Sequence, residues 1–192
     1  MTLEKGFEMD KKWLLSLLLA LPLVANAECY CDDEPEDDGE FRAYSYAGIK
    51  GGKHALNDAL VPAASNTGTG LGFYIGTRYT EYFAVEWDYT RLGNVMTTTN
   101  GNASTQALSL SGVHQVNMGL FDLYGKLGLS YAHTSFPAAV PSTTNIGLNY
   151  GLGLNIQLDK DIDVRLGWEN YKVKATGKSD DALTFTGISY RY

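Results

Sequence analysis

Residues 83–89 read Phe-Ala-Val-Glu-Trp-Asp-Tyr, and this stretch decides the fold. Phe83 and Trp87 share one parity, whereas Glu86 and Asp88 share the other. Because a β-strand points alternate side chains to opposite faces, the stretch predicts a strand with one aromatic, apolar face and one acidic face. Similar runs precede and follow it. We therefore predict an all-β fold, an eight-stranded antiparallel up-and-down transmembrane β-barrel with its apolar residues facing lipid.

Eight segments carry this alternation, and each is long enough to cross a bilayer at a tilt, which takes about 9–11 residues. They span residues 42–53, 69–80, 82–93, 105–117, 119–133, 145–158, 162–173 and 182–192. The connections after the second, fourth and sixth segments are short, whereas the others are longer and rich in Asn, Thr, Ser, Gly and Pro. Short turns on one side and longer loops on the other are typical of outer-membrane barrels.

The first part of the chain has the pattern of an export signal. Residues 1–27 hold an apolar core after two lysines and end in the A-x-A cleavage pattern at residues 25–27, as in a secretory signal peptide. Met9 is an alternative start, because it opens the basic region directly. Residues 28–41 form an acidic arm that we expect to be disordered, and the barrel is expected to occupy residues 42–192.

Charge and cysteine content limit the function classes. The formal net charge is -7, but from residue 41 onward 12 bases stand against 11 acids, so the acidity belongs to the arm. A near-neutral barrel offers no basic stripe for nucleic acid. Cys29 and Cys31 lie in the arm, too close in sequence for an unstrained disulfide with each other and without enough nearby ligands for a zinc site. A weak divalent-cation site is the alternative interpretation of the acidic block, but we expect no metal and no cofactor.

Five bases and five acids occupy the parity opposite to the apolar face. They are Arg42, Lys50, Arg78, Glu86, Asp88, Asp122, Lys126, Asp163, Arg165 and Glu169. A Lys or Arg that faces lipid at mid-bilayer costs ~2–4 kcal/mol, so these side chains are expected to face the lumen. Eight strands enclose room only for side chains. The sequence therefore predicts a lumenal network of ion pairs that plugs the barrel.

The last segment breaks the alternation. Three of its residues share one parity: Ile188, Tyr190 and Tyr192. Leu183 and Phe185 share the other. A β-bulge near Gly187 would bring both sets to the lipid face, and we predict one there.

Several of these motifs resemble the transmembrane domain of outer membrane protein A and the related small eight-stranded outer-membrane barrels. The similar stretches are residues 82–89 with 92–93, 122–128, 162–168 and 187–192. The resemblance implies that Glu86 pairs with Arg165 across the lumen, with Lys50 and Lys126 as further lumenal bases. It also implies that the aromatic C-terminal run is an assembly signal, which consists of Ile188, Tyr190 and Tyr192.

The same resemblance bears on gating. The family's alternative lumenal pair, a lysine on the fourth strand with a glutamate on the sixth, is missing, because Ser111 or Leu110 and Asn155 stand at those positions. A static plug is therefore expected instead of a switchable gate.

We expect a bacterial outer-membrane protein of structural, surface-interaction or adhesion type. Its expected partners are outer-membrane lipid and lipopolysaccharide, the barrel-assembly machinery through the C-terminal strand, and a host or surface ligand at the long loops. We expect no nucleic acid.

Three other interpretations remain open. One is a small pore of low conductance. Another is a barrel enzyme that modifies lipid A, for which His133 and Ser135 have the His-x-Ser spacing of some barrel deacylases, although no acid lies nearby in sequence to orient the histidine. The last is a soluble barrel that binds a ligand against an inward apolar face.

Overall fold

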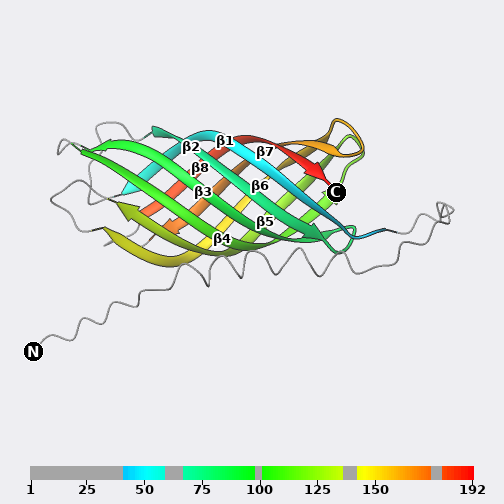
Figure 1. Cartoon of the computed structure of the whole chain (residues 1–192), viewed down its shortest axis with the longest axis horizontal. Coiled ribbons are helices and arrows are strands. Elements are labelled where there is room, and N and C mark those ends of the chain that lie inside the picture. The colour runs from blue at the N-terminus through cyan, green and yellow to red at the C-terminus, as the bar shows by residue number, and fades with distance from the viewer. Residues whose placement is uncertain (1–40, 59–66, 98–100, 136–141, 174–178) are drawn as a thin grey trace, which may run out of the picture. The chain divides into compact units, whose positions relative to one another are not determined.

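Eight antiparallel strands, each paired with its neighbours in the chain, make up the fold (Figure 1). They are β1 (Tyr44–Asp58), β2 (Thr67–Arg78), β3 (Phe83–Thr97), β4 (Gly101–Asn117), β5 (Phe121–Ser135), β6 (Thr143–Gln157), β7 (Ile162–Val173) and β8 (Ser179–Arg191). β8 also pairs with β1, so the sheet closes into a barrel without a free edge. The predicted eight-stranded antiparallel barrel is confirmed.

The computed structural model describes residues 41–58, 67–97, 101–135 and 142–192. The predicted signal peptide and all of the acidic arm except its last residue, Phe41, lie outside the described residues. Among the described residues, no helix is long and apolar enough to span a membrane.

The strands extend further towards the loops than the sequence predicted. β1 continues to Asp58, and the connection from β3 to β4 is reduced to residues 98–100. Backbone pairing can continue beyond the apolar part of a strand, because the ladder of hydrogen bonds does not require apolar side chains. Polarity therefore indicated where the apolar face ends rather than where the strand ends.

One circuit of the ladder fixes the tilt of the strands. Starting from Tyr46, the paired positions are Gly76, Glu86, Ser111, Gly128, Asn149, Tyr171 and Asp181, and the circuit returns to β1 at Leu56. The return point lies ten residues beyond the start, which is the shear of the barrel. A staggered closure requires strands that tilt against the barrel axis, and Figure 1 shows this tilt.

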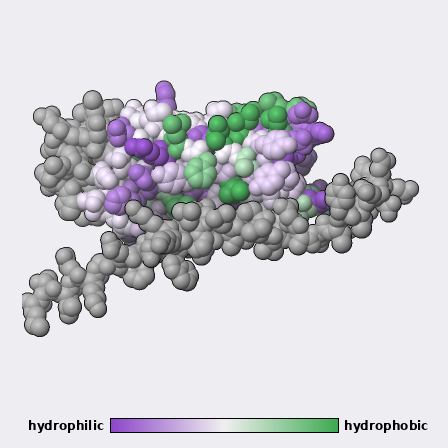
Figure 2. All heavy atoms as spheres, in the orientation of Figure 1, coloured by the Kyte–Doolittle hydropathy of each residue, from purple (hydrophilic) through white to green (hydrophobic). Residues whose placement is uncertain are grey.

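The outer wall is apolar and the interior is polar. Ile49, Leu127 and Ile146 are 64%, 63% and 69% exposed, whereas Glu86 and Lys126 are 0% and 3% exposed. Figure 2 shows apolar residues over the middle of the visible wall and towards the end that carries the C-terminus, with hydrophilic residues at both ends. This orientation is the predicted one. The soluble barrel with an inward apolar face is therefore wrong.

Short turns join β2 to β3, β4 to β5 and β6 to β7 at one end, which we call the turn side; the opposite end is the loop side. In the β4–β5 turn, Gly119 adopts a φ of 89°, a conformation that favours glycine. Its backbone N–H donates to the Asn117 side-chain oxygen (3.0 Å), and the Asn117 side-chain Nδ2 donates to the Asp122 carboxylate (2.8 Å). The turn thus holds Asp122 at the rim of the lumen.

The predicted bulge in the last strand is wrong. β8 pairs with β1 and β7 in continuous register through Gly187. Leu183 and Phe185 consequently point into the barrel, where they are 0% and 3% exposed. The irregularity lies instead between Leu92 and Val95, in the pairing of β3 with β4.

Candidate functional site: the filled lumen

A layer of charged side chains crosses the middle of the lumen. Lys126 of β5 lies at its centre, with its Nζ 2.8 Å from Glu86, 3.3 Å from Asp88 and 3.1 Å from Glu169. One ammonium group thereby bridges β3, β5 and β7. All four side chains are at most 2% exposed, so the ion pairs are shielded from bulk water.

Lys50 of β1 enters the same layer from the other side. Its Nζ pairs with Asp88 and lies 2.5 Å from Glu169. The Tyr171 hydroxyl accepts from Lys50 (3.2 Å) and donates to Glu169 (2.5 Å). Thr90 adds a hydrogen bond to Asp88 (2.7 Å). The carboxylates thus have hydroxyl donors as well as ammonium groups.

Arg165 forms the next part of the layer, towards the turn side. Its guanidinium donates to Glu86 (2.6 Å) and to Asn155 (2.9 Å). Three tyrosine rings surround it at 4.3–5.6 Å from the guanidinium carbon to the ring centroids: Tyr46, Tyr74 and Tyr124. This cation–π cage holds the pair between Glu86 and Arg165 that the resemblance implied.

Lumenal glycines make room for these rings. A Cβ on Gly76 would lie 2.5 Å from the Tyr46 hydroxyl, and a Cβ on Gly48 would lie 2.6 Å from that of Tyr74. No side chain fits at such a distance without a shift of the ring. The cage around Arg165 therefore depends on glycine at both positions.

A second set of ion pairs lies at the turn-side rim. Arg78 pairs with Asp122 at 3.6 Å, and Asp163 pairs with Arg191. Asp163 and Asp122 are thus both at the rim, below the central layer. A cavity of about 10 Å³ remains among these side chains, which is enough room for about one water molecule.

Arg42 is the predicted lumenal base that the structure places elsewhere. It precedes β1, and its side chain is exposed. Arg191 fills the corresponding role, since its Nε donates to Asp163 (2.7 Å). The sequence interpretation missed Arg191 because it assigned the C-terminal run to assembly. The signal was present, because Arg191 shares its parity with the buried Ser189.

An apolar layer lies in the lumen on the loop side of the charged layer. Its buried residues are Leu92, Ala107, Ala132, Tyr171, Leu183 and Phe185. The ring of Phe185 lies 5.1 Å from the Lys50 Nζ, so the two layers are in contact. No part of this layer was predicted, because Leu183 and Phe185 were assigned to the lipid face.

Two other kinds of site can be compared with this geometry. Oxygens of Glu86, Asp88 and Glu169 lie within 4.8 Å of one another, as in a metal site, but the ammonium groups of Lys50 and Lys126 contact all three carboxylates. The arrangement is therefore one of paired ions.

The positions that would carry a family-type gating pair are uncharged. Asn155 accepts from Arg165 (2.9 Å), and Ser111 accepts from Asn149 (2.9 Å). Both side chains are hydrogen-bonded inside the lumen. Neither carries a charge that could form an alternative ion pair with Arg165 or Lys126.

A known protein family and several solved structures share this fold. The family model of the outer membrane protein beta-barrel domain matches residues 15–191. The chain belongs to this family. The outer membrane protein beta-barrel domain places it in the bacterial outer membrane, as predicted, and the resemblance to small outer-membrane barrels is confirmed.

Solved structures of the same fold include Neisserial surface protein A, with 16% identity, a TM-score of 0.62 and coverage of 79% of this chain and 100% of that chain. Ail, the attachment invasion locus protein of Yersinia pestis, has 16% identity, a TM-score of 0.58 and the same coverage. OprG from Pseudomonas aeruginosa has 13% identity, a TM-score of 0.55 and coverage of 80% and 98%. At such identities the likeness concerns the fold alone. No curated protein sequence matches the chain.

Proposed function

We propose that the protein is a non-conducting, non-enzymatic outer-membrane barrel that acts at the cell surface through its loop side, in adhesion or another surface interaction. The observation that carries the proposal is the filled lumen. A charged layer around Lys126 and an apolar layer around Leu183 lie one above the other. An eight-stranded barrel filled in this way has no room for a solute. The loops then remain as the part that meets other molecules.

The charge of the loop side supports an anionic surface partner. The connecting segments at residues 59–66, 98–100, 136–141 and 174–178 contain no Asp or Glu, and Lys174 and Lys178 lie in the last. The acids beside these segments belong to strand ends: Asp58 ends β1, and Asp180 and Asp181 lie at the start of β8. Ail has been solved in complex with the heparin analogue sucrose octasulfate. A sulfated polysaccharide has the charge that would complement such loops.

The contacts of His133 support a non-enzymatic role. In an enzyme of the His-x-Ser type, an acid would orient the histidine. Here the His133 Nδ1 lies 2.8 Å from the Thr144 hydroxyl instead. A Ser135→Ala variant is expected to leave lipid A unchanged in a membrane assay, as the wild type does. Modification of lipid A by the wild type that is lost in Ser135→Ala would contradict this part of the proposal.

Conductance in planar lipid bilayers tests the plug. We expect no steady channels from the wild type. Arg165→Ala alone should add little current, because the apolar layer remains. Arg165→Ala combined with Leu183→Ala and Phe185→Ala should open a steady conductance, since both layers are then reduced. Arg42→Ala is the matched control, because Arg42 is exposed. Large stable channels in the wild type would overturn the plug and favour the pore.

Adherence tests the surface role. Bacteria that express the protein should bind a surface coated with sulfated polysaccharide more strongly than bacteria that lack it. The Lys174→Gln/Lys178→Gln variant should lose most of this binding. Equal adherence with and without the protein would argue against adhesion of this type.

The C-terminal strand is the proposed contact with the barrel-assembly machinery. Ile188, Tyr190 and Tyr192 all face outward and are 46%, 55% and 56% exposed. Such a row is available to a partner before insertion. Deletion of Tyr192 should reduce the heat-modifiable, folded fraction in the outer membrane. Refolding of the same variant from urea into pure lipid should be affected much less.

A further inference from the structure

Three basic side chains face outward on the loop-side half of the barrel wall. They are Lys53 of β1, Arg91 of β3 and Lys172 of β7, and all are exposed. Among the side chains that the structure describes, a set that does not include Asp180, none forms an ion pair with any of the three. The lumenal network does not use these charges, and neither does the proposed plug.

The register places the three bases near one level. Lys53 pairs with Thr69, and Arg91 pairs with Leu71, two residues nearer the turn side. The shear of ten raises the ladder towards the loop side by a little over one residue for each strand from β1 onward. Over the two strands from β1 to β3 this rise offsets the two residues by which Arg91 is paired nearer the turn side than Lys53. In the other direction, Lys172 is linked through Asp180 of β8 to Asn57 of β1, and the same rise places Lys172 near the level of Lys53. The bases therefore form a band across β7, β8, β1, β2 and β3.

Aromatic side chains lie directly on the membrane side of this band. Tyr89 is two residues from Arg91 on the outer face of β3, and Trp168 is four residues from Lys172 on that of β7. The Tyr150 ring lies 5.9 Å from the Lys172 Nζ and 5.7 Å from the Trp168 ring. Aromatic girdles mark the membrane interface in outer-membrane barrels. The band is thus at the level of the lipid headgroups.

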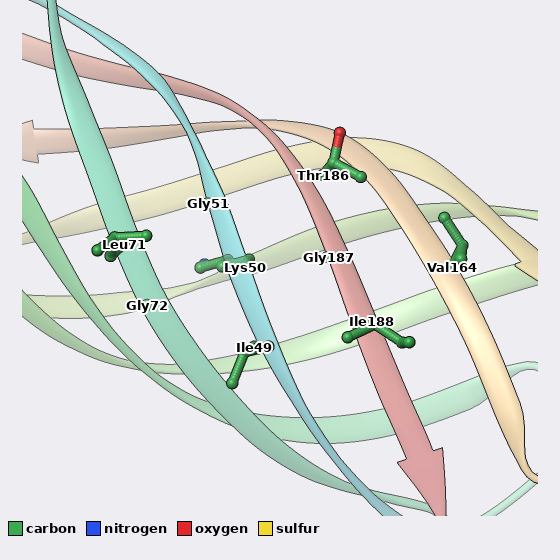
Figure 3. A pocket seen from close by; sticks show the side chains of 9 residues that line it. All are labelled: Ile49, Lys50, Gly51, Leu71, Gly72, Val164, Thr186, Gly187 and Ile188. Carbon is green, nitrogen blue, oxygen red and sulfur yellow. The ribbon is translucent and has the colours of Figure 1, made fainter.

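A groove in the outer wall leads away from the band into the membrane. A hollow of about 580 Å³ is lined by Lys53, Gly51, Thr184, Thr186 and Leu166. A second hollow of about 540 Å³ shares Gly51 and Thr186 with it. Figure 3 shows this second hollow over β1, β2, β7 and β8, between the side chains of Ile49, Leu71, Ile188 and Val164.

The lining of the groove has the character of a lipid site. Its floor consists of small residues on β1 and β8, and its sides are branched aliphatic side chains. The walls of the lower hollow are formed by the apolar side chains of Ile49, Leu71, Val164 and Ile188. An acyl chain can bury apolar area there, while the basic end of the groove meets a negative group.

We propose that the groove and the basic band together bind a phosphorylated glycolipid of the outer leaflet, lipid A, with a phosphate at Lys53 and Arg91 and an acyl chain along β1 and β8. Charge complementarity selects the phosphate, and the apolar groove selects a lipid over a soluble polyanion. A soluble sulfated polysaccharide would meet the loops, whereas these side chains project from the wall at headgroup level. Lys172 pairs with Asp180 in the β7–β8 ladder and contributes least.

Native mass spectrometry of the detergent-folded full chain with added lipid A tests this site. The wild type is expected to retain one tightly bound lipid A. Lys53→Gln/Arg91→Gln should lower the affinity roughly tenfold or more, because each base near the phosphates adds to the attraction. Thr186→Phe fills the groove and should also lower it, with both basic residues intact. Arg42→Gln/Lys160→Gln removes two exposed bases at the opposite rim and should change nothing.

Two comparisons separate the sources of binding. The affinity of the wild type for dephosphorylated lipid A should be no higher than the affinity of Lys53→Gln/Arg91→Gln for intact lipid A. Soluble heparin should bind the wild type and this variant equally. The proposal would be overturned if the wild type and all variants bound lipid A with equal affinity. It would also be overturned if Lys53→Gln/Arg91→Gln lost heparin binding but kept its affinity for lipid A. Heat-modifiable mobility on gels checks that each variant is folded. Neither outcome depends on whether the lumen conducts.

Discussion

Two layers of side chains fill the same lumen by different physics. Around Lys126, ammonium and carboxylate groups contact one another within 3.3 Å and leave little space. Around Leu183 and Phe185, apolar side chains pack without any charge. The charged layer depends on the presence of every partner, because a lone buried charge is costly. The apolar layer depends on volume, because its contacts are additive and non-directional.

The difference has a consequence for substitution. Loss of one charged side chain changes the balance of the whole charged layer, since Lys126 alone contacts three carboxylates. Loss of one apolar side chain leaves a local cavity only. The following variants test this contrast through the free energy of unfolding in lipid vesicles, measured by urea titration with Trp fluorescence.

Lys126→Met is expected to have the largest effect. It leaves Glu86, Asp88 and Glu169 close together with too few cations, and breaking a buried ion pair in this way costs ~3–5 kcal/mol. Lys160→Met is the control, because Lys160 is exposed in a turn. Equal stability of the two variants would show that water reaches the charged layer and screens it.

Leu183→Ala is expected to cost ~2–4 kcal/mol, the range for removal of a buried leucine with a cavity left behind. The loss should be independent of salt concentration, because the contacts that are removed are apolar. Leu71→Ala removes a leucine from the outer wall, where Leu71 is 66% exposed, and serves as the matched control. A loss at Leu183 no greater than at Leu71 would contradict the inward position of Leu183.

Gly76→Ala should cost ~1–3 kcal/mol, as expected for overpacking, because the new Cβ meets the Tyr46 ring. Gly125→Ala is the control, since a Cβ there meets nothing within 4 Å. Gly76→Ala strains the tyrosine cage around Arg165 without removing a charge. It therefore separates the effect of packing from the effect of charge within the charged layer. Full stability of Gly76→Ala would mean that the cage adapts easily.

Arg42→Ala should change stability by less than ~0.5 kcal/mol, the usual range for exposed sites. Arg191→Ala should cost more, because it removes the partner of Asp163 at the rim. The two variants delete the same type of side chain near the same end of the barrel. The reverse order would restore Arg42 to the lumenal network.

The sequence alone determined the barrel, its orientation and most of its lumenal charges. These features depend on side-chain parity, which is a local property with a period of two. Glu86, Lys126 and Arg165 could be assigned to the interior because each stands opposite apolar neighbours within its own strand. A strand with its two faces reversed would be strongly destabilised, since a charge that faces lipid is costly.

Tertiary structure decided which groups meet. The pairing of Lys126 with carboxylates from β3 and β7 depends on the shear of the closed barrel, which no single strand encodes. The same holds for the apolar layer. Leu183 and Phe185 looked misplaced within their strand, and only their packing with Leu92 across the lumen explains them. Local alternation specifies a face, whereas closure specifies the neighbours on that face.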